Sequence, residues 1–229
     1  MKKYIKNLIP VKLYETFFIN KSFSHEGEDL IINKIFSQYS SNYKGFYIDI
    51  GAYHPMRYSN TYLLYKLGWN GINIDANPDS MKLFKKYRSR DINLECAISS
   101  KKETKTYYMF NDPALNGFSK QLSQQRNCFL DYKIINQLEV ETFPLYEILN
   151  KYLQPSQQID LFNIDVEGLD FEVLKSNDWN KFKPKVIVIE ILECDFLKVI
   201  HTDIYKFLID LGYYPYSKTF STMIFSLKE

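Results

Sequence analysis

The amino-acid sequence predicts a doubly wound α/β fold, and two patterns carry this prediction. Short apolar segments alternate with amphipathic segments of helical period from residue 26 onward. Apolar runs of roughly four to eight residues are typical of buried strands, whereas the amphipathic segments are typical of helices. Helix-length connections join parallel strands, and their handedness places helices on both faces of the sheet. We therefore expect βαβ units that form a parallel sheet between two layers of helices.

The first half of the chain is expected to supply three strands of this sheet. The predicted strands cover 45–50, 71–75 and 92–98, and the predicted helices 26–39, 59–67 and 77–88. Glu26, Glu28 and Asp29 crowd the start of the first helix, where acidic groups suit the helix dipole. Asn77 is expected to cap the third helix, with Pro78 at its first position.

The second half continues the alternation around a long polar segment. Strands are predicted at 104–110, 139–143, 159–164 and 185–191, helices at 144–152, 169–175 and 202–211, and a hairpin at 213–216 and 222–227. Residues 111–137 are polar and lack a period, and we interpret them as a loop or lid over the site, with a disordered surface insertion as the alternative. Residues 1–43 are expected to form an arm and a helix packed on the core, and 44–229 a single domain.

Composition excludes several classes of protein. Of the 229 residues, 45% are hydrophobic and 24% charged, which excludes a disordered chain, a collagen-like fibre and a disulfide scaffold. The net charge of +2 is too small for a protein whose main task is to bind nucleic acid. Cys96, Cys128 and Cys194 show no metal-binding spacing and suit a reducing compartment. No segment is apolar enough for a membrane span or a signal peptide, so we expect a cytoplasmic protein.

Acidic side chains stand at the carboxyl ends of several predicted strands. They are Asp49, Asp75, Asp165 with Glu167, and Glu190. Ligands of open α/β sheets bind beyond the carboxyl ends of the strands, so these acids predict a site at that edge. Asp75 follows the second strand, where an acid accepts hydrogen bonds from both hydroxyls of a ribose, although it could also cap a helix.

The turn after the first strand indicates which ribose ligand to expect. It begins with Gly51, which lets the backbone approach a ligand closely. Residues 52–56 all carry side chains, and one of them is a proline. A dinucleotide-binding fingerprint has further glycines at these positions, so that the backbone can approach the diphosphate. NAD and FAD are therefore disfavoured, and a ribose cofactor without a diphosphate, such as S-adenosylmethionine, is favoured.

Several of these stretches together resemble the FkbM-type S-adenosylmethionine-dependent methyltransferases. The matching segments are 49–55 with 59–61, 68–78, 159–168 and 186–190, which include Gly-Trp-Asn-Gly at 68–71 and Asp-Val-Glu-Gly at 165–168. The acidic segment 24–29 also resembles one that precedes the first strand in this family. The family usually has Glu-Pro-Asn-Pro where this chain has Asp-Ala-Asn-Pro at 75–78. The resemblance implies a Rossmann-like methyltransferase fold with a mostly parallel seven-stranded sheet and an antiparallel strand in the C-terminal hairpin.

The resemblance also assigns cofactor-binding roles residue by residue. Asp49 and Gly51 would lie beside the methionine moiety, Asp75 at the ribose, and the backbone of Cys96 and Ala97 at the adenine. Ser59, Asn60 and Thr61 open a helix and could bind the cofactor carboxylate, or simply cap that helix. The candidate cofactor-binding residues are thus Glu28, Asp49, Gly51, Ser59, Asn60, Thr61, Asp75, Ala97 and Asp165.

Three residues are candidates for catalysis: Asp165, Glu167 and His54. An alcohol attacks a sulfonium methyl poorly unless its proton is withdrawn and the two atoms are held in line, so a carboxylate base is expected. Alternatively, Asp165 binds the cofactor amine and Glu167 caps the next helix. His54 follows the first strand and could serve as the base. With Glu190, the two acids could also hold a divalent metal such as Mg²⁺, which we do not favour.

The resemblance implies both an O-methyltransferase activity and the class of its acceptor. Members of the family methylate hydroxyls of sugars, polyketides and similar compounds, so we expect a small-molecule or glycan acceptor with a free hydroxyl, such as a sugar of a surface polysaccharide or its nucleotide-linked precursor. A secondary metabolite is the alternative acceptor, and a non-catalytic module that binds an adenosine ligand is the alternative function. A nucleic-acid N-methyltransferase is disfavoured because 165–168 lacks the Pro-Pro-aromatic motif. No oligomeric state is indicated.

Overall fold

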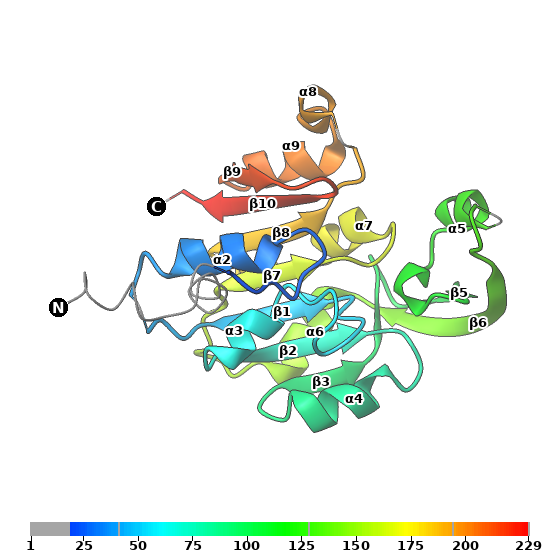
Figure 1. Cartoon of the computed structure of the whole chain (residues 1–229), viewed down its shortest axis with the longest axis horizontal. Helices are drawn as coiled ribbons and strands as arrows, with labels where there is room; N and C mark the ends of the chain where they lie inside the picture. The colour runs from blue at the N-terminus through cyan, green and yellow to red at the C-terminus, as the bar shows by residue number, and fades with distance from the viewer. Residues whose placement is uncertain (1–18, 41, 128, 194, 229) are drawn as a thin grey trace, which may run out of the picture.

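The computed structural model describes residues 19–228 apart from 41, 128 and 194, and its centre is a seven-stranded sheet (Figure 1). The strand order is β3-β2-β1-β7-β8-β10-β9. The strands are β3 (Ile92–Glu95), β2 (Asn70–Asp75), β1 (Phe46–Ile50), β7 (Leu161–Ile164), β8 (Val186–Glu190), β10 (Thr222–Leu227) and β9 (Tyr213–Lys218). The strands from β3 to β8 are parallel, whereas β10 runs antiparallel to both of its neighbours. The predicted doubly wound fold, including its C-terminal hairpin, is confirmed.

Helices cover both faces of this sheet. On one face lie α2 (Glu28–Phe36) and α3 (Tyr62–Lys66), and on the other α6 (Leu145–Tyr152), α7 (Asp170–Lys175) and α9 (Asp203–Asp210). Strand β8 illustrates the result, because Val186 and Val188 pack toward α2 while Ile187 and Ile189 pack toward α6 and α7. All four side chains are at most 1% exposed, as expected for a central strand built from Val and Ile.

A second, three-stranded sheet stands beside the carboxyl ends of the main strands. It has the order β4-β6-β5 and consists of β4 (Ala97–Ile98), β6 (Ile134–Phe143) and β5 (Glu103–Phe110). In Figure 1, β5, β6 and α5 (Lys120–Arg126) lie to the right of the main sheet. The prediction of one strand over 92–98 is wrong. That segment divides at Cys96, whose N–H donates to the carbonyl of Asp75. Beyond Cys96 the chain leaves the main sheet, and β4 pairs in the second sheet.

Two predicted helix starts also need correction. The helix expected from Asn77 is α4 (Ser80–Tyr87), and its N-cap is Asp79 in a left-handed conformation with no side-chain cap. The helix expected from Ser59 begins at Tyr62, whose N–H donates to the hydroxyl of Ser59. The cap predicted at Thr202 is confirmed, because its side chain accepts from the N–H of Tyr205.

Three further elements were not predicted: the 3₁₀ helix η3 (Pro113–Leu115), α5, and the short α8 (Phe196–Val199). Strand β6 also begins at Ile134, inside the segment 111–137 that was predicted to be a loop. Within the described ranges, no helix combines the length and the apolar character needed to cross a bilayer. Cys96 carries a free thiol, while Cys128 and Cys194 fall outside the described residues, as do residues 1–18 of the predicted N-terminal arm.

Candidate active site

A cavity of about 410 Å³ lies at the carboxyl ends of β1, β2, β7 and β8. The order of the strands reverses between β1 and β7, which is where open α/β sheets bind their ligands. The volume falls within the range of small-molecule sites, about 300–1,000 Å³. The acids predicted to share this edge do line the cavity: Asp49, Asp75, Asp165, Glu167 and Glu190. So do five other predicted residues: Glu28, Gly51, Ser59, Asn60 and Ala97.

Asp75, at the end of β2, is held by the turn that follows β1. Its Oδ2 accepts from the N–H of Tyr53 and its Oδ1 from the N–H of Asn77, both at 2.7 Å. Burial raises the pKa of Asp75 to about 6, although the two N–H groups oppose the rise. Each carboxylate oxygen can accept two hydrogen bonds, so both retain capacity for a ligand. Asn77, predicted as a helix cap, instead helps to orient Asp75.

Asp49 lies near the end of β1 in a row of polar side chains. It is in register with Asn73 of β2 and Asn163 of β7. Its Oδ1 accepts from the side-chain amide of Asn163 at 2.8 Å, and its Oδ2 from the hydroxyl of Thr61 at 2.5 Å. Burial raises the pKa of Asp49, whereas Thr61 and the charge of Arg88 oppose the rise.

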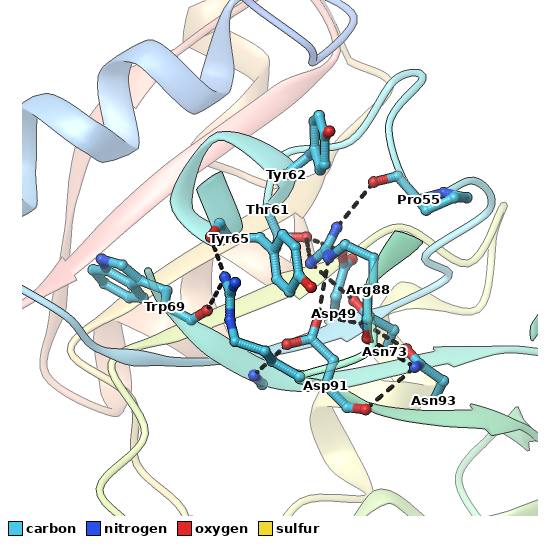
Figure 2. Close-up of polar contacts among 12 residues, drawn as sticks. Asp49, Pro55, Thr61, Tyr62, Tyr65, Trp69, Asn73, Arg88, Asp91 and Asn93 are labelled. Carbon is cyan, nitrogen blue, oxygen red and sulfur yellow. Dashed lines mark hydrogen bonds and ion pairs between the residues drawn. The ribbon is translucent and has the colours of Figure 1, made fainter. Parts of the chain in front are cut away.

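Thr61 does not take the place predicted for it. It is fully buried, it does not line the cavity, and its hydroxyl bonds Asp49 (Figure 2). The expectation that the Thr61 hydroxyl binds a cofactor directly is therefore corrected, because that hydroxyl lies behind the cavity wall and contacts two residues that line it, Asp49 and Ser59. Asn60 does line the cavity, and its side-chain amide donates to Asn163 at 2.9 Å.

Asp165, Glu167 and Glu190 form a cluster of acids in which oxygens from all three lie within 4.8 Å of one another. Burial, and then repulsion from Glu190 and Glu167, raises the pKa of Asp165 well above its usual value. Burial and neighbouring acids raise the pKa of Glu190 to about 9. Oδ1 of Asp165 is buried and has no hydrogen-bond partner among the described residues. The cluster can share protons and can offer one carboxylate as a base, and oxygens so placed could also hold a divalent cation.

The loop between β7 and α7 sets the direction of Glu167. Its backbone is left-handed at Glu167, with φ 55°. Asp170 accepts from the N–H groups of Val166 and Gly168, both at 3.1 Å, and so fixes the loop. The N-cap of α7 is Leu169, so the alternative in which Glu167 caps this helix is wrong. Its carboxylate pairs instead with Arg126 at 2.5 Å, which opposes the burial that raises the pKa of Glu167.

His54 lies outside the cavity, contrary to the prediction that it could serve as the base. Its Nδ1 accepts from the N–H groups of Met56 and Arg57, at 3.1 and 3.0 Å. Burial and the charge of Arg57 lower the pKa of His54. The ring therefore stabilises the turn that carries Tyr53, and its lone pair is occupied by the backbone.

The polar segment 111–137 contributes one wall of the cavity. Lining residues from it include Asp112, Leu115, Asn116, Phe118 and Arg126. Asn116 ties this wall to the ribose-side turn, because its amide donates to Asn77 at 3.3 Å while its Oδ1 accepts from the N–H of Phe110. Sequence reasoning places the segment over the site and marks Asp112 and Asn116 as turn residues that could touch substrate, but it misses Leu115, Phe118 and Arg126. Arg126 gave no signal because its partner, Glu167, is 41 residues away in the chain.

Aromatic rings stand at another side of the cavity. Tyr53 and Tyr58 stack with ring centroids 6.3 Å apart, and His25 contacts Tyr58 edge-on at 4.9 Å. All three line the cavity. Both tyrosines have positive φ, 53° and 54°, a conformation that costs energy and persists only where the surroundings impose it. Such strained positions cluster at functional sites, in agreement with the position of this cavity.

Comparison with known families accounts for this arrangement. The model of the methyltransferase FkbM domain matches residues 49–215, which is more than half of the chain. The chain belongs to the FkbM methyltransferase family. No curated protein matches this FkbM methyltransferase in sequence.

Two solved structures resemble this FkbM methyltransferase with a TM-score of 0.46 each. One is a methyltransferase FkbM from Methylobacillus flagellatus KT, with 10% identity over 80% of this chain and 43% of the other. The second is a precorrin-6y C5,15-methyltransferase from Geobacter metallireducens GS-15, with 15% identity over 92% of this chain and 93% of the other. The present chain thus spans less than half the length of the Methylobacillus protein.

Membership of this family implies the use of S-adenosylmethionine, and the cavity of this FkbM methyltransferase suits such a ligand. Asp75 and Asp49 present acceptors on neighbouring strands, while Asp165 has a buried oxygen that no described residue hydrogen-bonds. Leu115, Phe118 and Ala97 supply apolar surface near Asp75. The cavity thus combines hydrogen-bond acceptors for the hydroxyl and ammonium groups of the cofactor with apolar walls for its adenine ring.

Proposed function

We propose that this FkbM methyltransferase transfers a methyl group from S-adenosylmethionine to a hydroxyl oxygen of a sugar. One observation carries the proposal: Asp75, Asp49 and the acidic cluster around Asp165 line a single cavity at the switch point of the sheet. This arrangement provides, in one space, acceptors for the polar groups of the cofactor and a base for the acceptor alcohol.

Each part of the cofactor would be held by residues at the carboxyl end of a different strand. Asp75 would accept from the ribose hydroxyls, and the backbone of Ala97 with Leu115 would border the adenine. Asp49, Ser59 and Asn60 would face the methionine end, and Glu28 is a further cofactor-binding candidate among the residues that line the cavity. These assignments agree with the rule that an acid after the second strand binds ribose.

The chain's own contribution to the reaction is proton removal and alignment. When bound, S-adenosylmethionine supplies a methyl group on a positively charged sulfur. Asp165 or Glu167 would accept the proton of the attacking hydroxyl. Burial raises the pKa of both, and a carboxylate with a raised pKa is the stronger base once ionised. A positive charge bound nearby favours that ionised form. Walls from 111–137 limit the access of water.

A sugar suits the remaining groups of the cavity. Tyr53, Tyr58 and His25 offer ring surfaces, while Glu26 offers carboxylate oxygens as acceptors. Glu190, whose raised pKa favours its protonated form, offers a carboxyl group that can donate as well as accept. Flat amphipathic rings contact the C–H faces of a pyranose, and carboxylates accept hydrogen bonds from its hydroxyls. A sugar of a surface polysaccharide or its nucleotide-linked precursor has both features.

Incubation with methyl-labelled cofactor and a panel of sugars, nucleotide sugars and phenolic metabolites tests the proposal. We expect label in a sugar product as a methyl ether, identified by mass and by ¹³C NMR. Asp165→Asn and Glu167→Gln should lower kcat more than cofactor affinity for at least one of the two. Label on nitrogen or on a phenol would contradict the sugar assignment. Tight cofactor binding without transfer to any acceptor would instead favour an adenosine-binding module.

A further inference from the structure

A buried network of polar side chains lies behind the cavity, and Arg88 is at its centre (Figure 2). Arg88 ends helix α4 as its C-cap, is fully buried, and does not line the cavity. Its Nε pairs with Asp91 at 2.9 Å, and both side chains of this ion pair are fully buried. Arg88 therefore cannot touch a ligand, and any effect on one must pass through other residues.

Two contacts connect Arg88 to the cavity wall. Its Nη2 donates to the hydroxyl oxygen of Thr61 at 3.0 Å, and its Nη1 to the carbonyl oxygen of Pro55 at 3.1 Å. Thr61 in turn bonds Asp49, and Pro55 belongs to the turn that carries Tyr53. One guanidinium thus reaches both the acid at the end of β1 and the turn that orients Asp75.

Arg88 determines which atom donates and which accepts in the hydrogen bonds of Thr61 and Asp49. A guanidinium has only donors, so Thr61 must accept from it. The single hydrogen of the Thr61 hydroxyl is then free for another oxygen, and Oδ2 of Asp49 at 2.5 Å is much closer than Oγ of Ser59 at 3.4 Å. Asp49 consequently accepts at Oδ2, as it does at Oδ1 from Asn163.

The same directions continue to the cavity surface. Because the amide of Asn163 donates to Asp49, its oxygen is available, and it accepts from Asn60 at 2.9 Å. Asp49, Asn163 and Asn60 all line the cavity. The donors and acceptors of Thr61, Asp49, Asn163 and Asn60 therefore have one consistent arrangement. Arg88, which lies outside the cavity, determines it.

We propose that Arg88 is a positioning residue which, through Thr61, holds Asp49 as an acceptor that faces the cofactor's ammonium group. The inference rests on the proposed cofactor site and adds an explanation of how Asp49 is oriented within it. It predicts a selective defect. Loss of the Thr61 hydroxyl should weaken binding of ligands that carry the amino-acid portion, and leave ligands without it unaffected.

Isothermal titration with two ligands measures this selectivity. S-adenosylhomocysteine carries the amino-acid portion, whereas 5′-methylthioadenosine lacks it. For Thr61→Val we expect the Kd of S-adenosylhomocysteine to rise about tenfold, the loss typical of one hydrogen bond to a charged group. The Kd of 5′-methylthioadenosine should stay within about twofold. Thr61→Ser keeps the hydroxyl and should restore wild-type affinity for both ligands.

A matched control removes another buried hydroxyl at a distance from the cavity. Ser176 is 5% exposed and bonds only within its own region, with the N–H of Leu145 and the carbonyl of Val173. Ser176→Ala should leave both affinities unchanged. Equal weakening of both ligands in Thr61→Val would indicate a general structural role and overturn the proposal. Unchanged binding in that variant, or a Thr61→Ser variant as weak as Thr61→Val, would overturn it too.

Arg88→Lys tests the origin of the effect and does not depend on Thr61→Val folding. Lysine keeps a charge beside Asp91 but lacks the planar fork that reaches Thr61 and Pro55 together. We expect S-adenosylhomocysteine to lose more affinity than 5′-methylthioadenosine, whose smaller loss follows from the lost contact with Pro55. Adding Thr61→Val to Arg88→Lys should weaken S-adenosylhomocysteine little further. A folded Arg88→Lys protein with wild-type affinities would refute the role of Arg88. A wild-type protein that binds neither ligand would refute the proposed function itself.

Discussion

A β-carbon on Gly51 would lie 1.7 Å from the carbonyl oxygen of Asp165. Gly51 also has φ 80°, which is unfavourable for any side chain. The sequence suggested that this glycine admits a ligand, but the structure assigns it first to the close approach of two backbone segments. The carboxyl ends of β1 and β7 can thus bring Asp49 and Asp165 into one cavity.

Gly51→Ala should therefore prevent folding rather than merely reduce cofactor affinity. Backbone atoms cannot yield as a flexible side chain would, so the two strand ends must separate. We expect little soluble protein, or a melting temperature lowered by more than about 10 °C, since an overpacked and strained site costs several kcal/mol. Gly212→Ala is a control, because that glycine also has positive φ, 89°, but open space around it. A stable, well-folded Gly51→Ala protein would contradict this account.

Affinity for S-adenosylmethionine should depend on the ionisation of Asp75. Burial raises its pKa to about 6, and the ionised form is the better acceptor for two ribose hydroxyls. Affinity should therefore be constant above pH 7 and fall as the pH drops below 6. Titration calorimetry of the wild type and Asp75→Asn at several pH values measures this. The variant should bind at least about tenfold more weakly at pH 7.5 and show a flatter profile, and equal affinity would remove the ribose assignment.

The stability of the ligand-free protein should fall as the pH rises, because of Glu190. The pKa of Glu190 is about 9 in the folded protein, against an ordinary value of 4.5. The folded state therefore binds a proton that the unfolded state releases, and the resulting stabilisation is complete below pH 4.5 and lost as the pH rises through 9. Glu190→Gln imitates the protonated form and should remove this part of the decline.

Thermal unfolding between pH 6 and pH 9 measures the effect. We expect the melting temperature of Glu190→Gln to exceed that of the wild type by at least about 2 °C at pH 9, the shift produced by ~1 kcal/mol in a chain of this length. The difference should shrink toward pH 6. Glu193→Gln provides a control on the segment after β8. Parallel curves for the wild type and Glu190→Gln would show that this carboxyl does not retain its proton.

Sequence patterns were sufficient for the main sheet but not for the walls of the site. The apolar run of β8 predicts its buried position because burial on both faces requires such a run. Helix α5 has the sequence KQLSQQR, with one apolar side chain, so no amphipathic period reveals it. Two contacts stabilise this helix: the N-cap by Ser119 and the ion pair of Arg126 with Glu167. The ion pair joins residues that are far apart in the chain, so the sequence does not reveal it.

Arg88 illustrates the same limit within the core. It follows two lysines and a tyrosine at the end of a helix, a pattern typical of an exposed terminus. Its burial depends on Asp91, three residues on, and on the hydroxyl of Tyr47 in β1, 41 residues earlier. Only the folded chain places these groups together, which is why the sequence predicts a role for Asp49 and Asn60 but none for Asn163 or Arg88.

The pair between Arg126 and Glu167 should set the pH at which catalysis begins. Arg126 lowers the pKa of both Glu167 and Glu190, acting against their burial. Removing this positive charge by Arg126→Gln should let both pKa values rise. Since a base must be ionised to accept a proton, the acidic limb of the kcat profile should then move to higher pH, by about one unit for each ~1.4 kcal/mol of lost interaction.

Lys120, at the start of the same helix α5, provides the matched control because it is exposed. Lys120→Gln removes the same charge and should leave the profile unchanged. Initial rates of methyl transfer between pH 5.5 and pH 9, at saturating cofactor, distinguish the cases. A displaced profile in both variants would indicate a general electrostatic effect of α5. A displacement confined to Arg126→Gln places the ionising group beside Arg126, and no displacement in either variant would exclude Glu167 and Glu190 from proton transfer and leave Asp165 as the candidate base.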